Sequence, residues 1–227
     1  MPRIQSHRTK YTYDDENRLT TAIYNDSQAS TAAWWRSDFT YDGLSRLRKR
    51  LDYTWSGSVW TLATTVEYVY YGMRVVQERD SGNTPTVSYT RCTDLSGTLQ
   101  GAGGIGGLLA RSSGYSSGSW STHYFYHADG KGNITYLVDN SQVLAASYRY
   151  DPFGNTISSS GSLASANVYR FSSKEVHVNN GMYYYGFRFY DPNLQKTAHG
   201  PTAATGRMEH IYSIQMGTIS KAIYRER

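Results

Sequence analysis

The sequence predicts an all-β fold, a spiralling ribbon of β-hairpins, and three observations support this prediction. Tyrosine is abundant, at 22 of 227 residues, and it suits a pleated, half-buried surface because its ring can pack while its hydroxyl stays hydrated. A short phrase of an aromatic residue, any residue, Tyr and Asp returns along the chain. No segment before residue 200 combines a capping signature with a helical apolar period, so no helix is expected.

Each copy of the phrase predicts a strand, a turn and a returning strand. The copies begin at Tyr11, Phe39 and Tyr148, and a shorter relative begins at Phe189. Alternate aromatic residues share one face of a strand, and Asp close to Gly, Pro or Asn favours a turn. The predicted repeat-turn residues are Tyr13, Asp14, Tyr41, Asp42, Tyr150, Asp151, Pro152, Gly154, Tyr190, Asp191 and Pro192.

Further strands are predicted where residues alternate in character without an Asp, at 65–70, 124–126 and 133–138. Three stretches rich in Ser and Gly are predicted as loops, and they cover 81–85, 112–121 and 158–167. The ordered alternation of strands and turns predicts a repeat architecture in which hairpins gain stability by pairing with their neighbours.

Charge and cysteine content limit the classes of function. The formal charge is +5, but acidic and basic residues are interleaved except in the cluster of Arg46, Arg48, Lys49 and Arg50. If that cluster lies on a strand, its three arginines share one solvated face, and no specific nucleic-acid partner is expected. The single cysteine, Cys92, excludes an internal disulfide framework and a thiolate zinc cluster.

No targeting or membrane segment is predicted. The first seven residues lack an apolar region, and no run of 18 apolar residues occurs, so the sequence indicates neither a signal peptide nor a membrane span.

A glycine-rich stretch, 101–106, matches the spacing of a dinucleotide-binding loop. Such a loop must join a strand to a helix, but residues 96–100 form only a weak strand and no amphipathic helix follows Gly107. We therefore predict a flexible crossing and no cofactor.

His123, His127 and Asp129 would share one face of a strand and so suggest a metal site. Two histidines four positions apart on a strand are separated by about 13 Å, which is too far to share one ion. His127 and Asp129 are therefore predicted to form a turn, and no metal site is expected.

The ordered set of these phrases resembles the YD-repeat or Rhs repeat-associated core family. The resemblance covers about residues 11–194, and it includes 94–101, 126–133, 150–154, 169–175 and 181–192 as well as the Tyr-Asp phrases. It implies a partial hollow shell that encloses or presents a polymorphic C-terminal toxin and is typically exported or placed on the cell surface. The implied partners are the rest of the shell and its cargo.

The expected domain organisation is a leader at 1–10, the repeat core at 11–194 and a divergent, disordered tail at 195–227. Family members continue beyond this point with Asp-Pro phrases that residues 196–227 lack in order. A frameshift after Gln195 would explain this difference.

The resemblance also implies self-cleavage by aspartates in an Asp-Pro-x-Gly segment beyond the core. Residues 151–154 have these letters but lie inside the repeats, so they are predicted as a turn, and no residue is predicted to be catalytic. The expectation is therefore a structural protein that is not an enzyme. The alternatives are an adhesion module that binds carbohydrate or protein through exposed aromatics such as Trp55 and Trp60, and, third, an autoprotease fragment.

Overall fold

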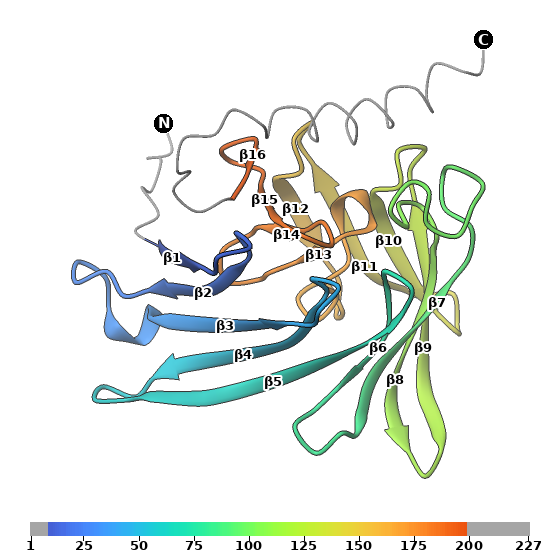
Figure 1. Ribbon diagram of the computed structural model, residues 1–227. Coiled ribbons are helices and arrows are strands. Elements are labelled where there is room, and N and C mark those ends of the chain that lie inside the picture. The colour runs from blue at the N-terminus through green and yellow to red at the C-terminus, as the bar shows by residue number, and fades with distance from the viewer. Residues whose placement is uncertain (1–8, 199–227) are drawn as a thin grey trace.

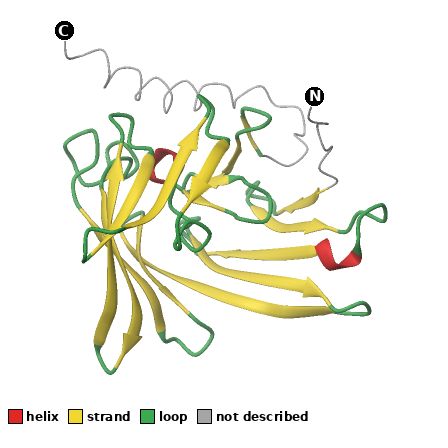
Figure 2. Cartoon of the chain, turned by 180° about the vertical axis from the view of Figure 1, so that it is seen from behind, coloured by secondary structure: helices red, strands yellow, loops and turns green. Residues whose placement is uncertain are grey.

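The computed structural model describes residues 9–198, and in this range the fold is all-β, which confirms the predicted fold class. The only helical elements described are two single-turn 3-10 helices, η1 (Thr31–Ala33) and η2 (Phe171–Ser173), both visible in Figure 2. The strands are β1 (Thr9–Tyr13), β2 (Leu19–Tyr24), β3 (Trp35–Tyr41), β4 (Leu47–Trp55), β5 (Trp60–Tyr71), β6 (Arg74–Arg79), β7 (Pro85–Arg91), β8 (Leu108–Ser116), β9 (Ser119–Ala128), β10 (Ile134–Asp139), β11 (Leu144–Tyr150), β12 (Thr156–Ser160), β13 (Glu175–Val176), β14 (Tyr183–Tyr184), β15 (Phe189–Asp191) and β16 (Lys196–Thr197).

The first 12 strands form one sheet in which every strand pairs with the next one along the chain. All of these pairs are antiparallel, so the sheet is a continuous ribbon of hairpins. Figure 1 shows the ribbon curving from the blue to teal strands β1–β5 through the green strands to the yellow strands β10–β12. Strands of consistent twist produce such curvature, and bulges increase it.

The chain after β12, residues 161–198, lies on the concave side of this ribbon, and we call it the inner segment (Figure 1). Its small sheet orders β13 to β16 consecutively. The Tyr184 hydroxyl accepts a hydrogen bond from the Leu47 amide at 3.0 Å, and the rings of Phe39 and Phe189 lie 5.1 Å apart. The buried side chains of sheet and inner segment form one continuous core.

The arginine cluster does not share one face, because β4 contains a bulge at its start. Thr40 pairs with Lys49 and Tyr41 with Leu47, so Arg48 is the extra residue. A bulge reverses the side-chain alternation beyond it. Arg48 is therefore exposed, whereas Arg50 faces the core with 11% of its side chain accessible.

Three local predictions are corrected. The stretch 112–121 is largely a hairpin of β8 and β9, because its residues pair across the two strands and the turn needs only Ser117 and Gly118, both at positive φ. The stretch 158–167 contributes its first residues to β12. Residues 96–100 form turns, since Asp94 holds them by side-chain hydrogen bonds.

The expected domain limits differ from the element limits at both ends. Strand β1 begins at Thr9, inside the expected leader. Strand β16 falls inside the expected tail and pairs with β15. The remainder of that tail, 199–227, and its predicted disorder lie outside the described residues. No helix in the described range is long and apolar enough to span a bilayer.

Candidate functional site

Three of the predicted repeat-turn aspartates, Asp14, Asp42 and Asp151, occupy equivalent turns, and Asp191 accepts from the amides two and three residues later. In the turn at Asp42, the carboxylate Oδ1 accepts hydrogen bonds from the backbone amides of Leu44 and Arg46 at 2.9 and 3.0 Å. The Asp42 amide donates to the Arg46 carbonyl, and Ser45 adopts a positive φ of 59°. Asp151 makes the same bonds to Phe153 and Asn155. Each aspartate therefore closes a turn by binding the backbone that follows it.

Hydrogen bonding also sets the charge of these turn aspartates. Partial burial opposes ionisation of Asp42, but the Arg46 side chain and the backbone amides of the turn outweigh it and lower the pKa of the carboxyl below its usual value. The pKa of Asp151 is lowered in the same way, with the Asn155 side chain replacing the arginine. A carboxylate saturated with donors from its own turn stabilises structure and has no free oxygen directed at a substrate.

Sequence reasoning missed that other aspartates form this turn. Asp80, Asp94 and Asp139 each accept from the amide two residues later. The sequence feature that these three turns share is an Asp with a return strand or a second turn beginning about four residues later. Asp129 does the same, as predicted, but His127 lies in β9 and stacks on Tyr136 with ring centroids 4.3 Å apart. The predicted turn role of His127 is therefore wrong.

The tyrosines before the turn aspartates connect successive hairpins. The Tyr41 hydroxyl donates to the Leu19 carbonyl at 2.8 Å, and the Tyr150 hydroxyl donates to the Ile134 carbonyl at 2.7 Å. Tyr190 reaches the Phe153 carbonyl at 3.0 Å. Each of these bonds reaches a carbonyl in an earlier turn or in the first residue of the strand after it, so the Tyr-Asp phrase couples a hairpin to its predecessor. Tyr13 is partly buried, and desolvation raises its pKa to about 12.

A buried charge cluster fixes the inner segment to the ribbon. Glu175 of β13 accepts hydrogen bonds through Oε1 from Arg50 at 2.6 Å and from the Tyr68 hydroxyl at 2.7 Å. The side chains of Arg50 and Glu175 are 11% and 6% exposed. Burial raises the pKa of Glu175, and the Arg50 guanidinium opposes that rise. The pair thus joins segments 125 residues apart.

A second polar group adjoins this cluster. Ser37 Oγ donates to Asp52 Oδ1 at 2.6 Å and lies 2.9 Å from His177 Nε2. Burial opposes ionisation of Asp52, but hydrogen bonds from His177 and Ser37 and the charge of Arg50 lower its pKa to about 2. The serine proton is directed at Asp52 rather than at the imidazole, and Ser37 is fully buried. This arrangement therefore anchors the inner segment and does not present a nucleophile.

Amide and hydroxyl groups anchor the inner segment farther along the ribbon. Asn167 is 1% exposed. Its Oδ1 accepts from the Tyr126 hydroxyl at 2.7 Å, and its Nδ2 donates to the Tyr148 hydroxyl at 3.3 Å. Arg111 donates to the Ala166 carbonyl at 3.1 Å. The two ends of the inner segment are thus bonded to opposite regions of the ribbon.

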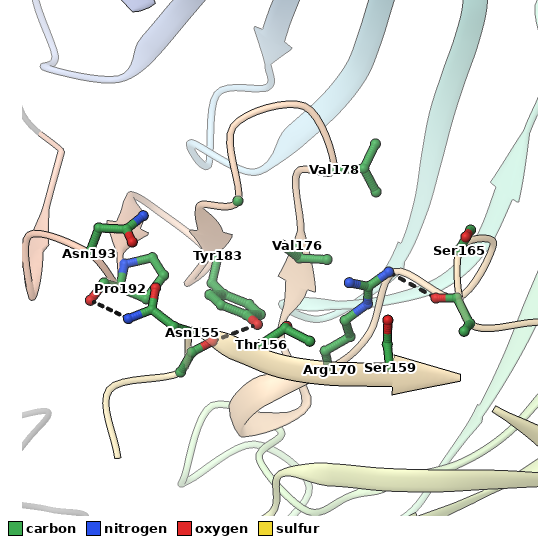
Figure 3. Close-up of a pocket in the computed structure, with 13 residues that line it drawn as sticks. Asn155, Thr156, Ser159, Ser165, Arg170, Val176, Val178, Tyr183, Pro192 and Asn193 are labelled. Carbon is green, nitrogen blue, oxygen red and sulfur yellow. Dashed lines mark hydrogen bonds between the residues drawn. The ribbon is translucent and has the colours of Figure 1, made fainter. Parts of the chain in front are cut away.

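A cavity of about 400 Å³ lies where the inner segment passes β12. Figure 3 shows Thr156 and Ser159 of β12 on one side and Val176 and Tyr183 on the other. The Tyr183 hydroxyl donates to the Gly154 carbonyl at 3.0 Å. The residues that line the cavity include no cluster of catalytic side chains.

The glycine-rich stretch folds around a carboxylate of the protein itself. Asp94 Oδ2 accepts from the amides of Ala102 and Gly104 at 2.8 and 2.9 Å. The Gly106 amide donates to Ser173 Oγ at 3.1 Å. Backbone amides that would bind a phosphate are therefore already used within the protein.

Two further candidate groups are placed by the structure. His123 bonds to Ser112 at 2.8 Å across the β8–β9 pair, and the described residues contain no group of three potential metal ligands.

Trp55 and Trp60 face each other across β4 and β5 with centroids 5.1 Å apart, and Trp34 packs on Trp55 at 5.6 Å. By strand alternation these rings lie on the face opposite Asp52, on the convex side.

Comparison with known proteins gives the following similarities, and no family model matches the chain. The chain is 28% identical over 193 residues to the tRNA3(Ser)-specific nuclease WapA of Bacillus spizizenii, covering 84% of this chain and 7% of the relative. It is 24% identical over 189 residues to the double-stranded DNA deaminase toxin A of Burkholderia cenocepacia, covering 82% of this chain and 13% of the relative. The chain therefore spans a small part of these relatives.

Solved structures show the same fold. The TcdB2-TccC3 crystal structure matches 88% of this chain with a TM-score of 0.57 and 16% identity, and the match covers 9% of that chain. The Tc holotoxin pore of Photorhabdus luminescens with the TccC3 D651A mutation matches 88% of this chain and 9% of its own, with a TM-score of 0.60 and 18% identity. These likenesses establish the fold.

The expectation of a protein that is not an enzyme is wrong. The curated relatives are named as tRNA nucleases and a DNA deaminase toxin. The expectation rested on the residues of this chain alone, whereas the relatives are far longer proteins.

Proposed function

From its relationship to Rhs-type toxin proteins, we propose that this chain is a wall segment of a YD-repeat shell that encloses or presents an enzymatic toxin. One observation carries the proposal: a curved twelve-stranded ribbon has its inner segment fixed on the concave face by buried hydrogen bonds. A ribbon with one covered concave face and open ends is suited to continue into further repeats.

The proposed division of the chain is a repeat core, widened from the expected 11–194 to include all of β1 and β16, followed by a divergent tail. The partners are the remainder of the shell and its cargo. The names of the relatives suggest that the whole protein modifies nucleic acid, as a nuclease or a deaminase. The role of the Tyr-Asp turns is to set hairpin spacing along the wall.

The test uses the complete gene product that contains this segment. Negative-stain electron microscopy should show a hollow particle, and limited proteolysis should leave the enzymatic region protected. Glu175→Lys, which places a second cation beside Arg50, should expose that region to protease, whereas Glu67→Lys on the outer face should not. A solid particle, or equal protection in both variants, would refute the proposal.

A second candidate function, adhesion, is favoured by the aromatic cluster of Trp34, Trp55 and Trp60 on the convex side. Such rings supply large, rigid contact area. Binding to a glycan array that is lost in Trp60→Ala but kept in Leu62→Ala would support it, and no binding by the unaltered chain would exclude it.

A further inference from the structure

Three cations from three separate elements meet at the glycine-rich stretch. Lys174, directly after η2, donates through Nζ to the Gly103 carbonyl at 2.6 Å. Arg74 of β6 lies beside Gly104, where an added β-carbon would be 3.7 Å from Arg74 Cγ and Cδ. Arg91, the last residue of β7, donates at 2.7 Å to the carbonyl that directly follows Arg74 in β6. We call Arg74, Arg91 and Lys174 the cation cluster, and the exposed Gly103 leaves it open to solvent.

The cation cluster has no carboxylate in contact with it. Its members take part in none of the ion pairs of the described residues, and each contacts a carbonyl oxygen and an aromatic ring. Asp94 acts on Lys174 through its charge, but both of its oxygens accept hydrogen bonds from residues of its own loop. Glu78 lies four positions after Arg74 in β6, about 13 Å along the strand. Around the cluster, three positive charges therefore face one negative charge.

Two observations indicate that this excess charge is not compensated within the described chain. Arg74 is 8% exposed, and its buried Nε has no hydrogen-bond partner among the described residues. A buried charged donor is normally paired with an acceptor. Burial and the charge of Arg91 lower the pKa of Lys174 to about 8, as expected where positive charge is in excess. An anion placed among the three side chains would relieve both effects.

We propose that the cation cluster binds a phosphate group, either as the free anion or as a monoester. Three cations and one carboxylate leave an excess of two charges, which matches a doubly charged phosphate better than a singly charged carboxylate. Arginine forks and lysine ammonium groups are the side chains with which proteins bind phosphate. The site differs from a dinucleotide-binding loop, because amides of the glycine-rich stretch already bind Asp94 and the side chains supply the charge. This site is independent of the proposed shell function.

The test is isothermal titration calorimetry of the full chain with inorganic phosphate, in sodium chloride of fixed ionic strength. The pH is about 7.5, above the second pKa of a phosphate monoester at about 6. Phosphate should give saturable heat for one site, and acetate, a singly charged probe, should bind at least roughly tenfold more weakly. Glycerol phosphate distinguishes the two sources of the group. Comparable affinity assigns the site to the monoester, and binding of inorganic phosphate alone assigns it to the free anion.

Substitutions of Lys174 test the site directly. Lys174→Met should weaken phosphate binding at least roughly tenfold. Lys10→Met removes one charge from an exposed position in β1 and is the matched control, so it should leave the affinity unchanged. Above the Lys174 pKa of about 8 the unaltered chain should lose affinity, whereas Lys174→Arg should keep it, because a guanidinium stays protonated. Far-UV circular dichroism verifies that the variants remain β-structured.

Three results would overturn the proposal. The first is the absence of saturable heat with phosphate. The second is equal affinity for acetate and phosphate, which would show that the excess of two charges does not select the ligand. The third is an affinity of Lys174→Met equal to that of Lys10→Met, which would place phosphate binding elsewhere on the protein.

Discussion

Replacing Glu175 by methionine tests whether the buried charge cluster fixes the inner segment. The substitution removes Oε1, which accepts hydrogen bonds from Arg50 and from the buried Tyr68 hydroxyl. Breaking a buried ion pair from one side costs about 3–5 kcal/mol, and an unsatisfied buried hydroxyl costs about 1–3 kcal/mol. Arg50 keeps its second carboxylate, Asp52, at 3.0 Å. We therefore expect a loss of about 3–4 kcal/mol of unfolding free energy.

The assay is equilibrium unfolding in urea, with the midpoint and slope fitted separately. Glu67→Met is the control, because Glu67 pairs with Lys49 at the surface, where such pairs contribute less than about 1 kcal/mol. The double variant of Arg50→Met with Glu175→Met should lose less unfolding free energy than the sum of the two single variants, since both remove the same ion pair. Equal losses at Glu175 and Glu67, or strict additivity in the double variant, would refute the reasoning.

Three further outcomes are expected. The pKa of Asp52 is lowered to about 2 in the folded protein, so its ionised form stabilises the fold fully at pH values above its unfolded pKa of about 4, and this stabilisation is lost as the pH falls toward 2. Asp52→Asn should remove about 2 kcal/mol of this acid dependence of the unfolding free energy, measured by urea melts at a series of pH values. Gly132→Ala should cost about 2–3 kcal/mol, since its β-carbon would lie 2.5 Å from the nearest side-chain carbon. Gly118→Ala should cost about 1 kcal/mol, since it has a positive φ but open space, and equal melting temperatures for the two variants would contradict the packing argument. Tyr41→Phe removes the bond to the Leu19 carbonyl and should lower stability by about 1 kcal/mol in the same melts, and an unchanged midpoint would show that this bond does not stabilise the ribbon.

The hairpins were predictable because their signals are local. An aspartate such as Asp42 is bonded to residues two and four positions later, and the aromatic residues that flank it alternate along the same strand. Every ribbon strand pairs with its sequence neighbour, so the turn phrases alone convey the order of the sheet. Serine-rich strands such as β12 were misassigned because serine favours loops on average, while strand pairing depends on backbone groups.

The inner segment could not be predicted from such signals. Its anchors join residues more than 100 positions apart, as in Glu175 with Tyr68, and no short pattern marks them. The inward direction of Arg50 depends on one bulged residue, Arg48, which the two-residue alternation of a strand does not reveal. The enzymatic activity named for the relatives was not predictable for another reason: the region that they share with this chain is a small fraction of those proteins.

The order of the strands also determines when the concave face is closed during synthesis. Each hairpin of the ribbon can pair with the one made just before it, so the sheet can form progressively from its amino-terminal end. The bonds from Glu175 to Arg50 and from Tyr184 to Leu47 span 125 and 137 residues. They cannot form until the ribbon has left the ribosome, so the nascent ribbon keeps its concave surface accessible to water and chaperones until the inner segment emerges.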